Sequence, residues 1–330
     1  MDKDCGIKDY FLSLPEESRF DLFRKLRHEI VQPMHMLLGY SDLIETNIKG
    51  NENTKNILGI ELLLEETLDL GTTIHNLSLQ INEIRKSGPN ELEKNLTTME
   101  ELFMKSIYPI TEVQINGSHP KLNSYYSKLK SAKGCLKFTL SEIFNCQENE
   151  GFYFHQFLNL TYGLNNEVFE NNGITFHNTK NELITRLSYG STLNSLIGNA
   201  IKHSRASKIR IQFEERKQFQ DYKVSVIDNG KGINPFAIYQ SAIEEGIISY
   251  GTQLSDYQRL QLVFENGVKT EYSNANSMLC NFGTSEGLGL SGIKDRVIGR
   301  GGQVWVEPVP SGACFCFTIP KKLVICSQKR

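Results

Sequence analysis

The chain has 330 residues, which is enough for two domains with separate hydrophobic cores, or for one domain joined to a helical module. Its 36 basic and 38 acidic residues give a formal net charge of −2. Nucleic-acid binding normally shows a basic surplus or stripe, so this balance argues against a nucleic-acid partner. An acidic ligand would have to be held by a local arrangement of residues.

The cysteines and the N-terminus indicate the cellular compartment in which the protein is expected. The seven cysteines are odd in number and show no paired metal-ligand spacing, which favours free thiols in a reducing cytoplasm. Cys314 and Cys316 alternate with phenylalanines, a pattern that favours packing in a strand over redox chemistry. No apolar run approaches the roughly eighteen residues of a membrane span, and the first residues are too polar for a signal peptide. We therefore expect a soluble, cytoplasmic protein with no membrane span.

Four amphipathic helices are predicted in residues 15–147, after an N-terminal tail of residues 1–14. The first helix begins at a capping box from Ser13 to Glu16, and its apolar residues recur at the alternating spacing of a helical-bundle seam. The other three helices are predicted at about residues 54–86, 92–110 and 122–143. Together they could form two hairpins or one bundle, because the sequence does not decide which helices pair.

Residues 150–322 mix strands with helices. Helices are predicted at residues 154–171, 189–204 and 289–300, and strands at 174–177, 208–213, 222–227, 303–307 and up to 319. The two alternating strands 208–213 and 222–227 predict a hairpin with one buried face. Because strands come in runs with helices on one side, we expect an α+β protein: an all-α module followed by a two-layer α/β sandwich, not a parallel Rossmann sheet.

Residues 234–282 show only weak periodicity. A segment of this length without strong structure inside a compact domain is usually a lid. We therefore predict a lid at residues 234–286, and a C-terminal tail at residues 323–330.

One motif of the second domain brings a carboxylate to the end of a strand. Asp228 ends a predicted buried strand and enters a turn in which Gly230 and Gly232 would let a ligand approach the backbone. A carboxylate fixed there can accept a hydrogen bond from an exocyclic amine. Seen alone, the motif is more often an ordinary aspartate that starts a turn.

Two further motifs carry residues suited to phosphate and metal. Gly287 and Gly289 lie where a helix begins, and the free amides and the dipole of a helix start favour phosphate. Asn199 lies on an amphipathic helix, where its amide oxygen could complete the octahedral shell of Mg²⁺, and Lys202 could contact phosphate as a point charge. Each motif alone is common on polar surfaces, but their order and settings together indicate nucleotide binding.

In this order and spacing, the three motifs resemble the N, G1 and G2 boxes of the ATP-binding domain of sensor histidine kinases. The resemblance covers roughly residues 150–320 and implies a GHKL-type (Bergerat) fold that binds ATP and Mg²⁺. It implies that Asn199 is the Mg²⁺ ligand and that Asp228 contacts adenine. The four glycines, Gly230, Gly232, Gly287 and Gly289, would be the hinges and the phosphate loop of the lid.

The segment from Arg27 to Pro33 resembles the phosphoacceptor box of the same kinases. A neutral imidazole nitrogen of His28 is nucleophilic near pH 7, and Glu29 could hydrogen-bond the other ring nitrogen and draw off its proton. An exposed His-Glu pair alone would be ordinary surface. His35 shares the exposed face but lacks a following acid, which favours a surface histidine.

Two departures from the family pattern concern this helical module. Gln32 stands where the family usually has threonine or asparagine, at a position tied to dephosphorylation of the partner. Its amide could still orient a water, so phosphatase activity stays open. The family normally has one helix between the phosphoacceptor helix and the ATP domain, whereas this chain offers three in residues 54–147.

The resemblance implies a soluble two-component histidine kinase. It would transfer the γ-phosphoryl group of Mg-ATP to His28, and then to an aspartate of a response-regulator receiver domain on a separate chain. The family also implies a homodimer through the helices, although four helices in one chain could form an internal bundle and permit a monomer. Two alternatives stay open: a catalytically degenerate nucleotide-binding switch or scaffold, and an ATPase or serine kinase of the same superfamily that does not use His28.

Overall fold

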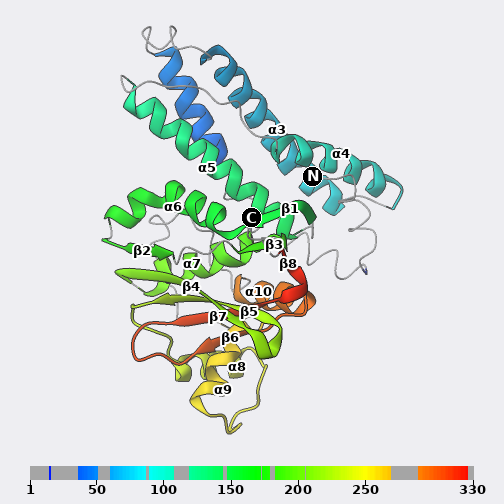
Figure 1. Ribbon diagram of the computed structural model, residues 1–330. Helices are drawn as coiled ribbons and strands as arrows, with labels where there is room; N and C mark the ends of the chain where they lie inside the picture. The colour runs from blue at the N-terminus through cyan, green and yellow to red at the C-terminus, as the bar shows by residue number, and fades with distance from the viewer. Residues whose placement is uncertain are drawn as a thin grey trace. The chain divides into compact units, whose positions relative to one another are not determined.

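The structure is a computed structural model of the chain (Figure 1). It describes Pro15 and residues 36–50, 60–86, 89–107, 119–143, 147–171, 173–178, 183–204, 206–268 and 289–325. The chain divides into two compact units. The first comprises Met1–Glu150 with Asn159–Leu164, and the second comprises Gly151–Leu158 with Asn165–Arg330.

The first unit is helical in its described residues. Its helices cover residues 36–49, α3 (Ile60–Lys86), α4 (Pro89–Ile107) and α5 (Pro120–Ile143). Helix α4 packs against both α3 and α5. The predicted helices at 54–86, 92–110 and 122–143 are confirmed where they are described, whereas the predicted start of the first helix near Ser13 lies outside the described residues.

The helix of residues 36–49 contacts two other helices of its unit. The side chain of Leu38 packs over Gly71 of α3, and the Lys128 ammonium of α5 lies 5.9 Å from the centroid of the Tyr40 ring. Leu37 and Ile44, which the seam pattern placed in the core, are fully buried. Each such side chain contributes about 1.5–3 kcal/mol by leaving water.

A five-stranded sheet forms the centre of the second unit. Its strands lie in the order β2-β4-β5-β7-β6, and all neighbours are antiparallel except β2 and β4. Their bounds are β2 (Thr175–Asn178), β4 (Lys208–Arg216), β5 (Asp221–Asp228), β6 (Val304–Glu307) and β7 (Cys314–Pro320). The predicted hairpin of β4 and β5 and the predicted α+β class are confirmed, and the sheet is not of the parallel Rossmann type.

Helices cover one face of this sheet (Figure 1). Helix α7 (Gly190–Ser204) packs on β5, α10 (Gly289–Gly299) packs on β6 and β7, and the two helices contact each other. Just before α7, the Tyr189 ring stacks on Phe317 of β7 and on Phe154, the first residue of α6 (Phe154–Asn171). The buried side chains of this face come from alternate strand positions: Ile209, Ile211, Val224, Val226, Phe315 and Phe317.

A second, smaller sheet was not predicted. Its strands are β1 (Gln147–Tyr153), β3 (Ile184–Leu187) and β8 (Val324–Ile325), in the order β1-β3-β8. The first half of β1 is polar and β8 has only two residues, so neither shows the alternation that predicts a half-buried strand. The C-terminal tail predicted at 323–330 therefore contains a short strand, β8.

The segment predicted as a lid contains regular structure in its described part. It forms α8 (Pro235–Glu244), α9 (Asp256–Gln261) and the 3₁₀ turn η3 (Leu262–Phe264). Asn234 caps α8 by accepting from two backbone amides, and Ser255 forms a reciprocal capping box with Gln258. The expectation of weak structure is therefore wrong for residues 235–244 and 256–264, and residues 269–286 lie outside the described part.

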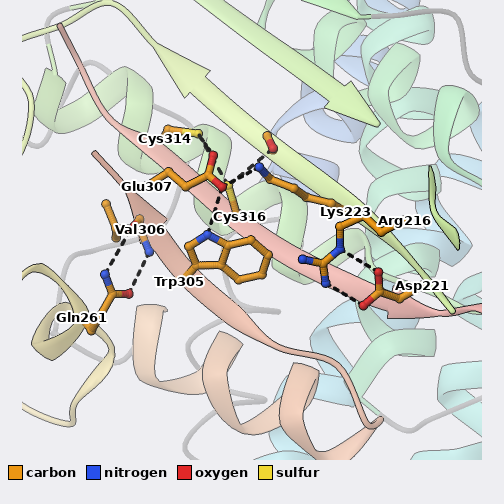
Figure 2. A network of polar contacts seen from close by, with 10 residues as sticks. Arg216, Asp221, Lys223, Gln261, Trp305, Val306, Glu307, Cys314 and Cys316 are labelled. Atoms are coloured by element: carbon orange, nitrogen blue, oxygen red, sulfur yellow. Dashed lines mark hydrogen bonds and ion pairs between the residues drawn. The ribbon is translucent and has the colours of Figure 1, made fainter. Parts of the chain in front are cut away.

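The side chain of Gln261 covers the outer edge of the sheet. Its Nε2 donates to the carbonyl of Val306 at 3.0 Å, and its Oε1 accepts from the Val306 amide at 3.0 Å, so one residue of α9 pairs with β6 as a strand would (Figure 2). The edge strand thus has both main-chain groups of Val306 hydrogen-bonded.

Replacing Gln261 by alanine is expected to lower the free energy of unfolding of the second unit by about 1–2 kcal/mol, because two hydrogen bonds to the backbone are lost. The chain has one tryptophan, Trp305, which lies in β6, so denaturant titration followed by its fluorescence reports on this unit. The matched control is Gln253→Ala. The Gln253 amide makes only an exposed 3.5 Å contact, and its loss should leave stability within about 0.5 kcal/mol. Equal effects of the two changes would contradict the edge-covering role.

Two other sequence-based expectations concern the thiols and the membrane. Three described cysteines, Cys135, Cys314 and Cys316, are free and buried, as predicted. Burial raises the pKa of the Cys135 thiol to about 12. Among the helices that the structure describes, none combines the length and the apolar character needed to cross a bilayer.

Candidate nucleotide-binding site

Asp228 is the last residue of β5, and its side chain is fixed by backbone amides from two loops. Its Oδ1 accepts from the Gly230 amide at 2.9 Å and from the Ala313 amide at 3.3 Å. The Asp228 amide in turn donates to the Ala313 carbonyl at 2.9 Å. The residue is only 4% exposed. A carboxylate offers about four acceptor positions on its two oxygens, so two amides use part of its capacity.

Two glycines let the loops around Asp228 meet backbone to backbone. Gly232 and Gly312 both have a φ of +76°, which side chains rarely adopt. A Cβ at Gly312 would overlap the carbonyl of Asp228, and one at Gly232 would lie 2.8 Å from the carbonyl of Gly312. The sequence analysis included Gly232 but did not single out Gly312.

Asn229 fastens the same loop to the start of β4. Its Oδ1 accepts from the amides of Ser207 and Lys208 at 3.0 and 2.8 Å, and its Nδ2 donates to the Ser207 hydroxyl at 3.0 Å. The sequence analysis did not single out Asn229. Its role depends on a partner 22 positions earlier in the chain, which no local pattern reveals.

The metal and phosphate candidates lie on the two helices of the covered face. Asn199 is half-buried on α7, beside the buried Leu196 and Ala200, and α7 packs on the strand that ends at Asp228. Lys202 belongs to the last turn of α7, but the position of its side chain is not described. Gly289 is the first residue of α10, which contacts α7.

The other predicted site residues lie outside the described part of the chain: Gly287, His28, Glu29 and Gln32. The structure therefore unites Asp228, Gly230 and Gly232 in one loop, and it brings their strand against the helix that carries Asn199. For the phosphoacceptor residues, the sequence-based predictions stand without a structural test.

Helix α10 is anchored at two points, so its first residue has a defined place in the second unit. The Lys294 ammonium lies 2.5 Å from Oε1 of Glu265, which follows η3. Near the other end, the buried Arg300 donates from Nη1 to the Ser188 carbonyl at 2.5 Å, and its guanidinium lies 4.9 Å from the centroid of the Tyr189 ring. These contacts attach α10 to the residue after η3 and to the residues just before α7.

The segment that contains the candidate site is similar in sequence to known proteins. Residues 186–323 match the family described as histidine kinase-, DNA gyrase B- and HSP90-like ATPases. A stretch of 103 residues is 30% identical to the chemotaxis protein CheA of Treponema pallidum (strain Nichols). It covers 31% of this chain but only 12% of that relative, so the chain spans a small part of it.

Two solved structures are also similar. The catalytic domain of the histidine kinase ThkA, in a nucleotide-free form, has a TM-score of 0.34 and 23% identity over 52% of this chain and 93% of that chain. The Acinetobacter baumannii histidine kinase AdeS has a TM-score of 0.36 and 16% identity over 77% of this chain and 97% of that chain. The family match covers β3, α7, the Asp228 loop and α10. Residues 186–323 are thus similar to the histidine kinase-, DNA gyrase B- and HSP90-like ATPases.

Proposed function

We propose that the chain is a histidine kinase that binds Mg-ATP in its second unit and phosphorylates His28. The phosphoryl group would then pass to an aspartate of a response-regulator receiver domain on a separate chain. The observation that carries the proposal is the buried Asp228 carboxylate, fixed by two backbone amides inside a matched ATPase domain. Homodimerisation through the helical unit belongs to the same proposal.

Asp228 would recognise the adenine ring. The amides of Gly230 and Ala313 orient its carboxylate, and an exocyclic amine is a donor complementary to a carboxylate oxygen. A hydrogen bond to an ionised acceptor contributes more than a neutral one, about 1.5–3 kcal/mol. Gly230 and Gly232 lack side chains, so the base can approach the loop backbone closely.

The phosphates would lie toward the helix ends. Gly289 begins α10, where backbone amides and the helix dipole favour negative charge, and Gly287 precedes it. Lys202 would supply a point charge. Mg²⁺ takes oxygen ligands and retains waters, so the half-buried amide oxygen of Asn199 fits as its protein ligand. When bound, the ion neutralises phosphate charge.

The transfer step uses a ring nitrogen of His28 as the nucleophile. The nitrogen bonds to the γ-phosphorus as the bond to the ADP oxygen breaks, so ADP leaves with that electron pair. Glu29 would accept a hydrogen bond from the other ring nitrogen and take up its proton as attack proceeds. Such transfers mainly require positioning and charge neutralisation, which the residue types supply. Gln32 is the candidate to orient a water for dephosphorylation of the partner.

The test is autophosphorylation with γ-labelled ATP and Mg²⁺. Wild-type protein should acquire acid-labile, alkali-stable phosphate, and His28→Gln should acquire none, because the nucleophile is removed. His35→Gln is the matched control on the same predicted helix face and should keep the label. A competition assay with a fluorescent ATP analogue should show that His28→Gln still binds nucleotide.

Each contrary outcome points to a different function. Label that persists in His28→Gln and resists acid would identify a serine kinase of the same superfamily. Nucleotide binding without label, in wild-type protein as well, would identify a nucleotide-dependent switch or scaffold. Release of labelled phosphate without labelled protein would identify an ATPase.

A further inference from the structure

The face of the sheet opposite α7 and α10 carries an arrangement that nucleotide binding does not use. Glu307 of β6 is paired in register with Cys314 of β7, and Cys316 lies two residues further along the same strand. Glu307, Cys314 and Cys316 lie close together in the structure (Figure 2). Since side chains alternate along a strand, all three project from the face of the sheet opposite to Phe315 and Phe317. Both thiols are nevertheless buried, with exposures of 2% and 0%.

The distances among the three side chains match those of a tetrahedral metal site. The two sulfurs lie 3.5 Å apart, and the Cys314 sulfur lies 3.9 Å from Oε2 of Glu307. One ligand atom from each residue lies within 4.8 Å of the others. Metal–sulfur and metal–oxygen bonds of about 2.3 and 2.1 Å, at tetrahedral angles, place two sulfurs about 3.8 Å apart and a sulfur about 3.6 Å from an oxygen. The side chains are thus close to ligand spacing before any metal binds.

Neighbouring side chains hold Oε1 of Glu307, while Oε2 faces the Cys314 thiol. Oε1 lies 2.6 Å from the Lys223 ammonium and 3.3 Å from the indole nitrogen of Trp305. The Ser225 hydroxyl lies 3.4 Å from the Cys316 sulfur. Ligating carboxylates in metal sites are usually oriented by such outer hydrogen bonds, which fix the ligand's position.

The charges also balance. Two thiolates and a carboxylate carry three negative charges, a divalent ion supplies two positive charges, and Lys223 supplies the third. A buried cluster with no net charge avoids the large cost of an uncompensated ion. Without metal, the neutral thiols and the Lys223–Glu307 ion pair are balanced as well.

We propose that Glu307, Cys314 and Cys316 bind a thiophilic divalent cation of the zinc class, with one position left for water. Thiolate ligands select such metals over Mg²⁺ and Ca²⁺, so this site would not compete for the ion of the nucleotide site. The bound ion would link β6 to β7. The proposal does not depend on the kinase function, because its three residues lie on the opposite face from the residues proposed to bind ATP.

The test uses the full chain, reduced and freed of metal, titrated with Co²⁺ as a spectroscopic probe. One equivalent should produce a sulfur-to-cobalt charge-transfer band in the near ultraviolet and the intense visible bands of tetrahedral cobalt. Excess Zn²⁺ should remove both, because it binds the same ligands more tightly. Zn²⁺ should also raise the midpoint of thermal unfolding followed by Trp305 fluorescence.

Variants assign the bands to this site. Cys314→Ser and Cys316→Ser should each lose most of the charge-transfer intensity, whereas Cys135→Ser, a buried cysteine of the other unit, should keep it. Glu307→Gln changes a partly exposed side chain and should fold; it should keep the charge-transfer band but bind Co²⁺ at least about 10-fold more weakly.

Several outcomes would overturn the proposal. These are the absence of charge transfer in the wild-type protein, bands that survive in the double variant Cys314→Ser/Cys316→Ser, or unchanged Co²⁺ affinity in Glu307→Gln. A disulfide between the two cysteines in the isolated protein, with no cobalt binding after its reduction, would point to a redox pair instead.

Discussion

Asp228→Asn is expected to lower the affinity for ATP by about 10- to 100-fold. The asparagine oxygen can still accept from the amides of Gly230 and Ala313, so the loop should keep its shape. The change removes the negative charge and presents an amide donor toward the adenine amine, and it forfeits a charge-assisted hydrogen bond of about 1.5–3 kcal/mol. Competition with a fluorescent ATP analogue measures the loss, and autophosphorylation should fall in parallel at limiting ATP.

Asp221→Asn is the matched control, because it makes the same change at the other end of the same strand. Asp221 forms a two-point ion pair with Arg216 at 2.8 and 2.7 Å. Its loss should cost some stability but leave ATP affinity unchanged. If both variants lost affinity equally, the effect would come from the strand as a whole and not from recognition of the base.

Gly312→Ala should be the most destabilising of the single changes considered, with a cost of about 3 kcal/mol or more in unfolding of the second unit. A Cβ in the left-handed region costs about 1–2 kcal/mol by itself. At Gly312 it would also overlap the Asp228 carbonyl, so the two loops must separate and weaken the hydrogen bonds between Asp228 and Ala313, at about 1 kcal/mol each. Denaturant titration followed by Trp305 fluorescence gives this free energy.

Gly246→Ala separates the two contributions. Gly246 also has a positive φ, of +70°, but nothing lies within 4 Å of the position of its Cβ. This change should therefore cost only about 1–2 kcal/mol. Gly312→Ala should in addition weaken ATP binding, since Asp228 moves with the loop. A cost at Gly312 no greater than at Gly246 would show that the loops are not held together as described.

The elements that sequence predicted well are those with a strong local period. Helix α6 was predicted at its observed bounds, with Gly173 closing it, and the alternation in β4 and β5 located both the hairpin and its buried face. The position of Asp228 at the end of a strand, with Gly230 and Gly232 in the loop after it, was also predicted, because the end of an apolar strand and a glycine turn are visible in the sequence.

The sequence analysis missed elements that are too short to show a hydrophobic period, and contacts between segments that are far apart in the chain. Helix α9 has six residues, and only its capping box, Ser255 with Gln258, marks it; α8 is marked by Asn234 followed by a proline. The partners of Asn229 and the position of Gly312 against Asp228 arise from contacts between distant segments. For the same reason, the spacing of the cysteines alone does not indicate the metal site proposed above. The third side chain, Glu307, joins them through the register of two strands.

The contact between Gln261 and β6 has a consequence for how this domain can associate. Peptides and second subunits often bind a sheet by adding a strand along an open edge, using its free amides and carbonyls. At this edge, the side chain of α9 already takes the place of an incoming strand at Val306. A partner could extend the sheet at Val306 only after displacing Gln261, so strand addition at β6 would be coupled to a movement of α9.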